Sequence, residues 1–389
     1  MGTGELVEAE VSGGLITAVR PLLGEPAESF PSDIWLLPGF VDVQVNGFAG
    51  EDFNGPEVSS DGITKAVQSL WREGVTQICP TITTDSAENM LNSLRAIVTA
   101  CEDARVSASI PCIHMEGPFI SPEDGSRGAH PKEHVRLPDW KELETWQEVT
   151  GGRIGIVTLA PEVEGGVEFV AQLANAGIVP GIGHTAASPE VIRQAAAAGA
   201  RLSTHLGNGA HAVLPRHPNY IWEQAAADEL WASVILDGHH LPPAVAKCLI
   251  RSKQVERTVL ISDAVSVAGL PPGRYRTLAM EVEVLPNRRC SLLGTPYLAG
   301  SVIDVRTGVG NAVKFAGVGA AQAVQMATLN PARLLGLEQR LGRVAAGQEA
   351  SMTVCRWQPH VSEIEVLLTV VAGQVVYEAS HRPAADIKL

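Results

Sequence analysis

Short segments in which apolar and polar residues alternate occur at both ends of the chain. Near the amino end, ELVEAEV and LITAVRP flank the pair Gly13–Gly14, which is the pattern of a β-hairpin. Near the carboxyl end, SMTVCRW and EVLLTVVAGQVVYE alternate or run apolar between turn residues. Both ends are therefore predicted to be rich in β-strands.

Between these ends, strand-like runs alternate with helical ones, which favours βα units around a parallel sheet. Two helical stretches, SAENMLNSLRAIVTACEDA and SPEVIRQAAAAGA, each open with a serine suited to cap the helix. The predicted core strands cover residues 40–47, 76–82, 110–117, 154–162, 179–185, 202–209, 231–238 and 258–265. Eight such units in about 300 residues fit an α/β fold of the (β/α)8 type, a TIM-like barrel. A doubly wound sheet is the alternative.

The composition supports a large folded core and narrows the possible partners. The chain has 389 residues, of which 45% are hydrophobic, enough for one large domain with a smaller attachment. The formal net charge of −14 argues against a nucleic-acid partner, because duplex binding depends on Lys and Arg at the phosphates. The charge still allows a small anion to be held by a few local cations.

Other sequence features bear on where the protein works. The opening segment MGTGELVEAEVSGG is acidic where a signal peptide is basic, and it lacks a continuous apolar run. The chain has no stretch near the roughly 18 apolar residues of a membrane helix. The six cysteines are scattered without a C-x-x-C pair, which is typical of reduced thiols and argues against a zinc–thiolate site. We expect a cytoplasmic enzyme with no membrane partner.

In barrels of this kind the chemistry lies at the carboxyl ends of the strands, and here those ends carry polar groups. From the first strand to the eighth, the groups are Gln44, Asn46, His114, Glu116, His184, His205, Asn208, Asp237, His239, His240 and Asp263. Each of them alone is more often a structural, turn or cap residue. Together they indicate a shared divalent-metal site, because unpaired polar groups in this place would be costly to bury.

The ligand types narrow the choice of metal. One carboxylate and two imidazoles leave a coordination position open for water or substrate, which is the pattern of catalytic zinc. Fe2+, Mn2+ or Co2+ would also accept this set. Gln44 and Asn46 are two residues apart on one strand, so both amides point to one face, where histidines would be the familiar ligands.

Six motifs resemble those of the amidohydrolase superfamily, and they occur in the order LPGFVDVQVNG, HMEGPFI, GIGHT, THLGN, DGHH and ISDA. More narrowly they look like the N-acetylglucosamine-6-phosphate deacetylase family, and the similarity runs from PGF at 38–40 to TLNPARLLGL at 328–337. The resemblance implies a metal-dependent hydrolase barrel at residues 39–337. It also implies a small β-sandwich domain built from residues 1–38 and 338–389, in agreement with the alternating pattern there.

The resemblance also assigns roles to residues. Glu116, His184 and His205 match the family's ligands for one divalent metal ion per chain, expected to be Zn2+. Asp263 matches the general base and acid, and His130, in GAHP, matches a residue that approaches the acetyl carbonyl. Substrate contacts are expected from Ala129, His130, Asn208, Gly209, Arg216, His240, Leu298, Ala299 and Gly300.

Gln44 and Asn46 resemble the one-metal members of the family, in which Gln-x-Asn replaces His-x-His on the first strand. The two amides would then line the site and hydrogen-bond water; the alternative is that they only hold the loop after this strand. His114 is expected to support Glu116. The loop 121–131 is expected either to close over the site as a lid or to be a static surface loop.

The implied reaction is removal of the acetyl group from N-acetylglucosamine 6-phosphate. The phosphate would be held by His240 and by Arg216 reaching in from a neighbouring subunit, so a homodimer is expected. One departure bears on the substrate: the chain reads HLGNGAHAVLPRHPNYIW where the family often reads H-L-x-N-A-M. The first alternative is another amidohydrolase acting on a different N-acyl or cyclic amide substrate. The second is a catalytically silent sugar-binding barrel.

Overall fold

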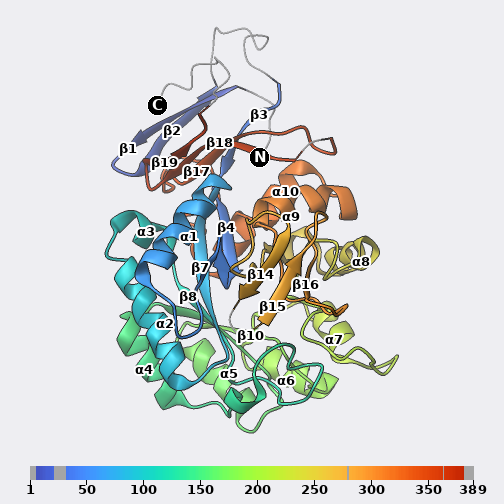
Figure 1. Cartoon of the computed structure of the whole chain (residues 1–389). Coiled ribbons are helices and arrows are strands. Elements are labelled where there is room, and N and C mark those ends of the chain that lie inside the picture. The colour runs from blue at the N-terminus through green and yellow to red at the C-terminus, as the bar shows by residue number, and fades with distance from the viewer. Residues whose placement is uncertain (1–5, 22–31, 278–279, 362, 381–389) are drawn as a thin grey trace.

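The computed structural model describes residues 6–21, 32–277, 280–361 and 363–380. Its largest element is an eight-stranded parallel sheet that forms a barrel (Figure 1). In order around the sheet the strands are β13 (Thr258–Ile261), β12 (Trp231–Ile235), β11 (Leu202–Ser203), β10 (Val179–Ile182), β9 (Ile154–Leu159), β8 (Ile113–Glu116), β7 (Val75–Thr83) and β4 (Phe40–Val45). Backbone bonds from Asp263 N to Gln44 O at 3.0 Å and from Asn46 N to Ala264 O at 2.8 Å close the barrel between β13 and β4. The predicted (β/α)8 fold is confirmed.

Helices follow most of the strands and cover the outside of the barrel (Figure 1). They are α1 (Ser60–Arg72), α2 (Ala87–Ala100), α3 (Ala104–Ser109), α4 (Trp140–Thr150), α5 (Gly166–Asn175), α6 (Pro189–Ala197), α7 (Tyr220–Ala226), α8 (Pro243–Lys253), α9 (Val305–Asn311), α10 (Ala320–Met326) and α11 (Leu329–Leu334). The two predicted serine caps are confirmed: Ser86 Oγ accepts from Asn89 N, and Ser188 Oγ accepts from Val191 N. Within the described residues, the helices are too short or too polar for any of them to cross a membrane.

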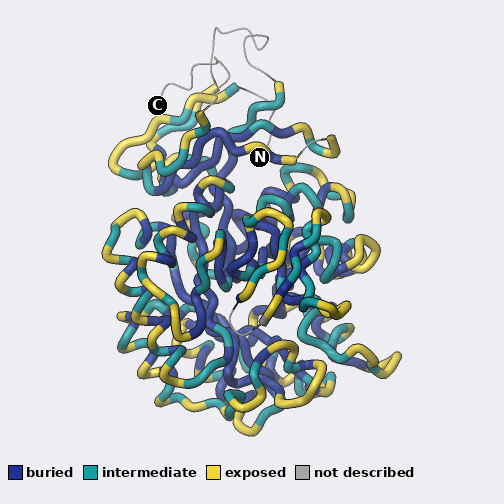
Figure 2. Tube along the Cα trace, viewed as in Figure 1, coloured by how far each residue is buried: buried dark blue, intermediate teal, exposed yellow. Residues whose placement is uncertain are grey.

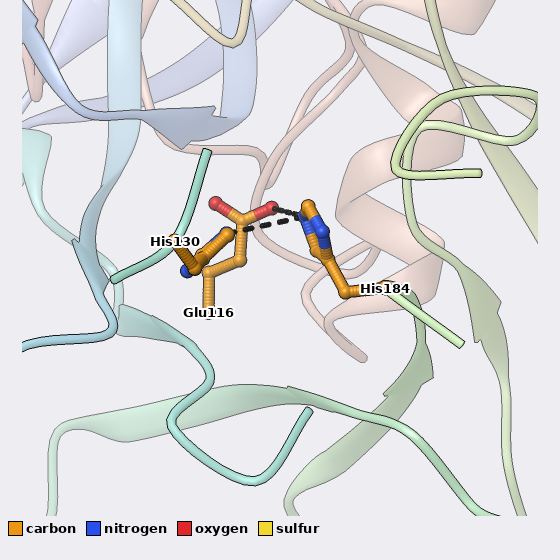
Figure 3. Close-up of side chains that lie close together, drawn as sticks. All are labelled: Glu116, His130 and His184. Atoms are coloured by element: carbon orange, nitrogen blue, oxygen red, sulfur yellow. Dashed lines mark hydrogen bonds and ion pairs between the residues drawn. The ribbon is translucent and has the colours of Figure 1, made fainter. Parts of the chain in front are cut away.

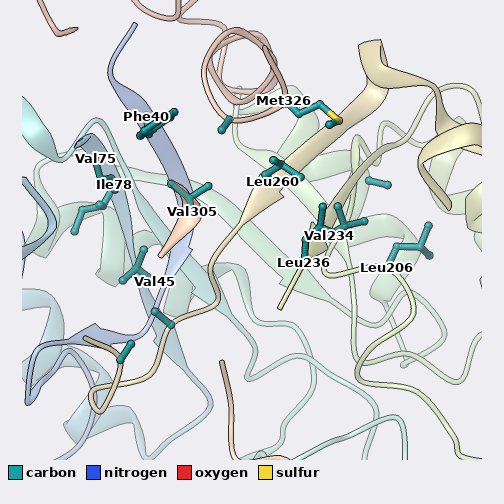
Figure 4. Packing of buried hydrophobic residues seen from close by; sticks show 14 of the residues in the cluster. Phe40, Val45, Val75, Ile78, Leu206, Val234, Leu236, Leu260, Val305 and Met326 are labelled. Atoms are coloured by element: carbon teal, nitrogen blue, oxygen red, sulfur yellow. The ribbon is translucent and has the colours of Figure 1, made fainter. Parts of the chain in front are cut away.

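Two groups of buried side chains hold the barrel together. The larger one lies between the strands and the surrounding helices and includes Phe40, Val75 and Leu260 (Figure 4). The smaller one comes mainly from the strands themselves and includes Cys79 and Ile156. The strands are therefore buried on both faces, which explains their nearly continuous apolar sequences. The barrel interior is a packed core that supports the site above it.

The two chain ends form a smaller β domain beside the barrel (Figures 1 and 2). The predicted hairpin is confirmed, because β1 (Val7–Ser12) and β2 (Leu15–Pro21) pair in antiparallel fashion. A second sheet has the antiparallel order β19 (Gln374–Glu378), β18 (Glu365–Val371), β17 (Met352–Arg356) and β3 (Ile34–Pro38). A backbone bond of 2.8 Å from Ile16 N to Gln348 O links the hairpin to the carboxyl-terminal segment. The predicted β-sandwich built from both ends is confirmed.

Several strands are shorter than the sequence pattern predicts, and the difference has a backbone cause. The predicted strands at 179–185 and 202–209 end at Ile182 and Ser203. His184 and His205 follow these ends with φ angles of +49° and +32°, values that no β-strand adopts. The chain therefore turns where the polar residues begin, and the site residues lie on turns above the barrel.

The structure also contains two small sheets that the sequence analysis did not predict. One consists of β14 (Gly273–Thr277), β15 (Met280–Val284) and β16 (Cys290–Leu292), and follows the eighth barrel strand. The other is a pair of two-residue strands, β5 (Gly47–Phe48) and β6 (Glu51–Asp52). Both are insertions at the carboxyl ends of barrel strands, where such additions leave the barrel itself unchanged.

Candidate active site

Three side chains from different strands converge on one point at the carboxyl end of the barrel. Glu116 is the last residue of β8, and His184 and His205 each lie two residues beyond a strand end. His205 Nε2 lies 2.8 Å and His184 Nε2 lies 3.2 Å from Glu116 Oε1, and the two nitrogens are 3.0 Å apart. All three side chains are buried. The structure thus brings together the three predicted metal ligands.

The backbone at this site adopts an unfavourable conformation in three places. His184, His205 and Asp263 have φ angles of +49°, +32° and +50°, in the left-handed region that residues other than glycine rarely occupy. Neighbouring groups hold each of these residues. Ser121 N donates to His184 O at 3.0 Å, and His205 N donates to Ser233 Oγ at 2.8 Å. Such strain is concentrated at functional sites, where it aims side chains that a regular strand could not.

The ring of His184 is prepared to bind a cation. Its Nδ1 lies 3.1 Å from the carbonyl oxygen of Ser126, which can only accept, so Nδ1 carries the proton. In the neutral ring, Nε2 then presents a lone pair towards Glu116 Oε1. Two acceptors 3.2 Å apart repel each other unless a positive charge lies between them. Support of the second ring nitrogen by a carbonyl oxygen is also usual for metal-binding histidines.

The distances between the three ligand atoms fit a metal centre. In a tetrahedral zinc site with bonds of about 2.0–2.1 Å, neighbouring ligand atoms lie about 3.3 Å apart. The corresponding distances here are 2.8, 3.0 and 3.2 Å, so small side-chain shifts would suffice. His205 Nδ1 is buried and has no hydrogen-bond partner in the described part of the chain, so no neighbour there restricts its proton. Glu116, His184 and His205 therefore form a candidate divalent-metal site.

His130 lies beside this site and competes for the place of third ligand. Glu116, His130 and His184 offer ligand atoms that all lie within 4.8 Å of one another (Figure 3). His130 Nε2 is 3.2 Å from His184 Nε2, and His130 Nδ1 is 2.8 Å from Thr84 Oγ1. Burial lowers the pKa of His130 to about 3, so this ring is neutral near pH 7.

Gln44 and Asn46 hydrogen-bond the two carboxylates of the site. This contact explains why the first strand carries amides where histidines would be the familiar metal ligands. Gln44 Nε2 donates to Glu116 Oε1 at 2.8 Å and to Asp263 Oδ1 at 3.1 Å. Asn46 Nδ2 donates to the same Asp263 oxygen at 2.8 Å. The amides thus keep two negative groups together. Their oxygens, Gln44 Oε1 and Asn46 Oδ1, are buried and have no partner within the described residues, so they remain available to a water molecule.

The surroundings set opposite proton affinities on the two carboxylates. Burial, and next the charge of Glu116, raise the pKa of Asp263 above its usual range. Burial alone would also raise the pKa of Glu116, but the close contacts with His184 and His205 outweigh this effect and hold the pKa of Glu116 well below its usual range. One carboxylate therefore stays ionised beside positive charge, while the other readily takes up a proton, which is the division of roles expected of a ligand and a base.

His114 has a different role from the one predicted. Its Nδ1 lies 3.0 Å from Val43 O and its Nε2 lies 2.8 Å from Thr158 Oγ1. Burial lowers the pKa of His114 to about 4, so the ring is neutral. His114 therefore joins β4 to β9 inside the barrel rather than hydrogen-bonding Glu116.

Several of the expected substrate residues lie beside the ligands or near Asp263. The backbone of Gly209 packs against the rings of His184 and His205, and Asn208 N donates to His205 O at 2.9 Å. The segment Leu298–Gly300 leads into Ser301, which bridges Ala264 beside Asp263. His240 Nδ1 lies 2.6 Å from Asp237 Oδ2.

The remaining expected substrate residues are exposed, and three further histidines lie on loops that follow barrel strands. Ala129 and Arg216 are exposed on the loops around the site. His217 is also exposed, whereas the ring of His211 lies between Tyr220 and Glu123. His239 Nε2 lies 3.0 Å from Asn287 O, a structural contact. The substrate contacts as such stay predictions.

Sequence reasoning missed three residues that support the site. Thr84 contacts His130, and Ser126 contacts His184. Glu162 accepts from Thr185 Oγ1 at 2.5 Å and from Ala186 N at 2.6 Å, directly after His184. The only signal in the sequence was that Thr84 lies just beyond one predicted strand and Glu162 ends another, which does not distinguish a supporting residue from a turn residue.

Comparison with known proteins agrees with this geometry. Residues 35–376 match the Amidohydrolase family. The chain is 33% identical to N-acetylgalactosamine-6-phosphate deacetylase of Escherichia coli O157:H7, with 92% of each chain covered. It is 32% identical to N-acetylglucosamine-6-phosphate deacetylase of Bacillus subtilis (strain 168), with 89% of this chain and 86% of the relative covered.

A solved structure of a deacetylase is also similar to this chain. The N-acetyl-D-glucosamine-6-phosphate deacetylase of Mycobacterium smegmatis superposes with a TM-score of 0.81 at 29% identity, covering 95% of this chain and 94% of the other. The chain therefore belongs to the amidohydrolase family. Within that family it is a metal-dependent deacetylase of the group that contains these relatives.

Proposed function

We propose that the protein hydrolyses the acetamide of an N-acetylhexosamine 6-phosphate and releases acetate and the amino sugar 6-phosphate. N-acetylglucosamine 6-phosphate is the proposed substrate. Relatives of similar identity are named for the glucosamine and for the galactosamine sugar, which differ in the configuration of one hydroxyl. The observation that carries the proposal is the convergence of Glu116, His184 and His205 beside a buried, proton-accepting Asp263.

The proposed metal ligands are Glu116 Oε1, His184 Nε2 and His205 Nε2. We propose Zn2+, one ion per chain, because a carboxylate with two imidazoles is a catalytic zinc set; Fe2+, Mn2+ and Co2+ are the alternatives. When bound, such an ion polarises the acetyl carbonyl and lowers the pKa of a bound water towards about 7. The amide at Gln44 favours a single ion, because its N–H occupies the space between Glu116 and Asp263.

Asp263 carries the proton transfers in this proposal, and three further residues of the chain support the reaction. Asp263 takes the proton of the attacking water and returns it to the departing amine, since its raised pKa lets it hold that proton between the two steps. Gln44 and Asn46 fix Asp263 Oδ1 and so leave its other oxygen for the transfer. His130 donates a hydrogen bond to the developing oxyanion. A Mycobacterium smegmatis aspartate-to-alanine mutant was obtained in complex with N-acetyl-D-glucosamine-6-phosphate, which agrees with an essential aspartate.

The sugar and its phosphate would be bound by the loops around the metal site. Arg216, His240 and the backbone of Asn208 and Gly209 are the proposed phosphate contacts, a local group of donors on an acidic protein. Arg216 is exposed, which suits a residue that reaches the site of a neighbouring subunit in a homodimer. The other proposed sugar contacts are Ala129, His130, Leu298, Ala299 and Gly300.

We also propose a cytoplasmic location and the domain limits stated above. The location is supported by the absence of disulfides among the six cysteines, which are all free. The limit at residue 38 is supported by the end of β3 at Pro38, and the limit at residue 338 by the end of α11, the last helix of the barrel, at Leu334.

Acetate release by the zinc-loaded protein tests the proposal. N-acetylglucosamine 6-phosphate, its galactosamine epimer and unphosphorylated N-acetylglucosamine should be compared, with Asp263→Asn as the inactive control. A strong preference for a phosphorylated sugar supports the proposal and identifies the epimer. Equal rates without phosphate would refute the phosphate contacts, and no acetate from any of the sugars would refute the substrate class.

A further inference from the structure

Thr84 contacts Nδ1 of His130, the ring nitrogen that faces away from His184. It follows β7 directly, and its side chain is buried, with 3% exposed. Thr84 Oγ1 lies 2.8 Å from His130 Nδ1, and the backbone N–H of Thr84 points at the same nitrogen from 3.4 Å. Two groups of one residue therefore meet a single ring atom.

The backbone contact determines which ring nitrogen of His130 carries the proton. An amide N–H can only donate, so Nδ1 must offer its lone pair to Thr84. A neutral imidazole has one N–H, which then lies on Nε2.

We propose that Thr84 is a positioning residue that keeps the proton of His130 on Nε2, from which it is donated to the acetyl oxygen of the substrate. This inference rests on the proposed deacetylation. It also decides between the two possible sets of metal ligands, because a nitrogen that carries a proton cannot ligate. Opposite partners thus give the two neighbouring rings opposite roles: a carbonyl oxygen makes His184 a ligand, and an N–H with a hydroxyl makes His130 a donor.

The packing behind Thr84 holds the hydroxyl in place. A Cβ atom at Gly117 would lie 2.1 Å from Thr84 Oγ1, and Gly117 has a φ angle of +88°. Only glycine fits this position, directly after the ligand Glu116. The hydroxyl therefore fits between the chain that carries Glu116 and the ring of His130, and the relative positions of ligand and donor depend on it.

The proton position can be measured without any substrate. Long-range 1H–15N NMR of zinc-loaded protein labelled with 15N-histidine distinguishes an N–H nitrogen from a lone-pair nitrogen, and His130→Gln identifies the His130 signals. We expect Nε2 to carry the proton. Protonation of Nδ1 in the unsubstituted protein would overturn the proposal. Because this readout needs no turnover, it separates the role of Thr84 from the choice of substrate: a protein that releases no acetate can still show the expected proton position.

Kinetics of three variants test whether the hydroxyl matters. Thr84→Val should lower kcat by about 10- to 100-fold with little change in KM, as expected for loss of a supporting contact. Thr84→Ser should restore most of the loss. The matched control is Thr83→Val, because Thr83 bonds to Asn54 rather than to the site, and it should stay near the unsubstituted rate. Equal losses in Thr84→Val and Thr83→Val, or no rescue by serine, would overturn the role of the hydroxyl.

Discussion

Replacing Gly209 by alanine should weaken metal binding through a direct collision with the ligands. A Cβ atom at this position would lie 2.8 Å from His184 Nδ1, 2.9 Å from His184 Cε1 and 3.2 Å from His205 Cε1. Ordinary contacts begin at 3.4 Å, so the ring of His184 must move by about 0.6 Å. That shift acts directly on the bond from His184 Nδ1 to Ser126 O, which fixes the lone pair of the ligand.

The size of the effect follows from two contributions that a matched control separates. Gly209 has a φ angle of +55°, so alanine there costs about 1–2 kcal/mol of stability from the backbone alone. Gly207 has a φ angle of +96° in the same loop, but a Cβ there meets the flexible side chain of Leu241 at 3.1 Å. Gly207→Ala should therefore lose stability and keep its metal affinity. Gly209→Ala should lose both, with zinc affinity lower by about 10- to 100-fold, or about 1.4–2.8 kcal/mol.

Zinc affinity from competition with a chromophoric chelator, together with Tm of the metal-free forms, gives both quantities. Unchanged zinc affinity in Gly209→Ala would refute the reasoning, because it would show that the rings yield without leaving the ligand positions. An equal loss of affinity in Gly207→Ala would also refute it, since the loop strain and not the ring contact would then be the cause.

Three further predictions concern the proton and charge balance. Asp263→Asn should lower turnover by at least about 10²-fold with zinc content unchanged, measured by acetate release and metal analysis; retained turnover would remove Asp263 from the mechanism. Gln44→Glu replaces the N–H shared by Glu116 and Asp263 with a third carboxylate, so kcat should fall steeply, and an unchanged kcat would contradict the bridging role. Burial lowers the pKa of Lys253 to about 8, so the unfolded chain binds more protons than the folded one between pH 8 and 10.5. The free energy of unfolding, measured with denaturant, should therefore rise with pH across this range relative to that of Lys253→Met. The same pH dependence in both proteins would contradict the lowered pKa of Lys253.

The positions of the metal-site residues could be predicted from the sequence because a barrel brings all strand ends to one face. Glu116, His184, His205 and Asp263 needed only the eight strands in the right order. The sequence separations of these four residues do not show that they meet in space. The repeated pattern of an apolar run followed by a polar group does indicate it.

The partners of these residues could not be predicted in the same way. The proton on His184 is set by the carbonyl of Ser126, which lies 58 positions away in a loop with no regular pattern. The strand lengths were overestimated for a related reason, because the left-handed backbone at His184 and His205 leaves no trace in hydropathy. The sheet β14–β16 was missed because its strands are short and lie outside the βα repeat.

The backbone bonds that close the barrel between β13 and β4 make activity depend on the completion of folding. Asp263 and Gln44 lie 219 positions apart, and both one of these backbone bonds and the side-chain bond above it join them. A nascent or truncated chain that lacks its eighth strand has the metal ligands but no base held in place. Joining such distant segments is among the slowest steps in building a domain. Turnover thus reports that the ring of strands has closed, and a partly built chain cannot hydrolyse its substrate.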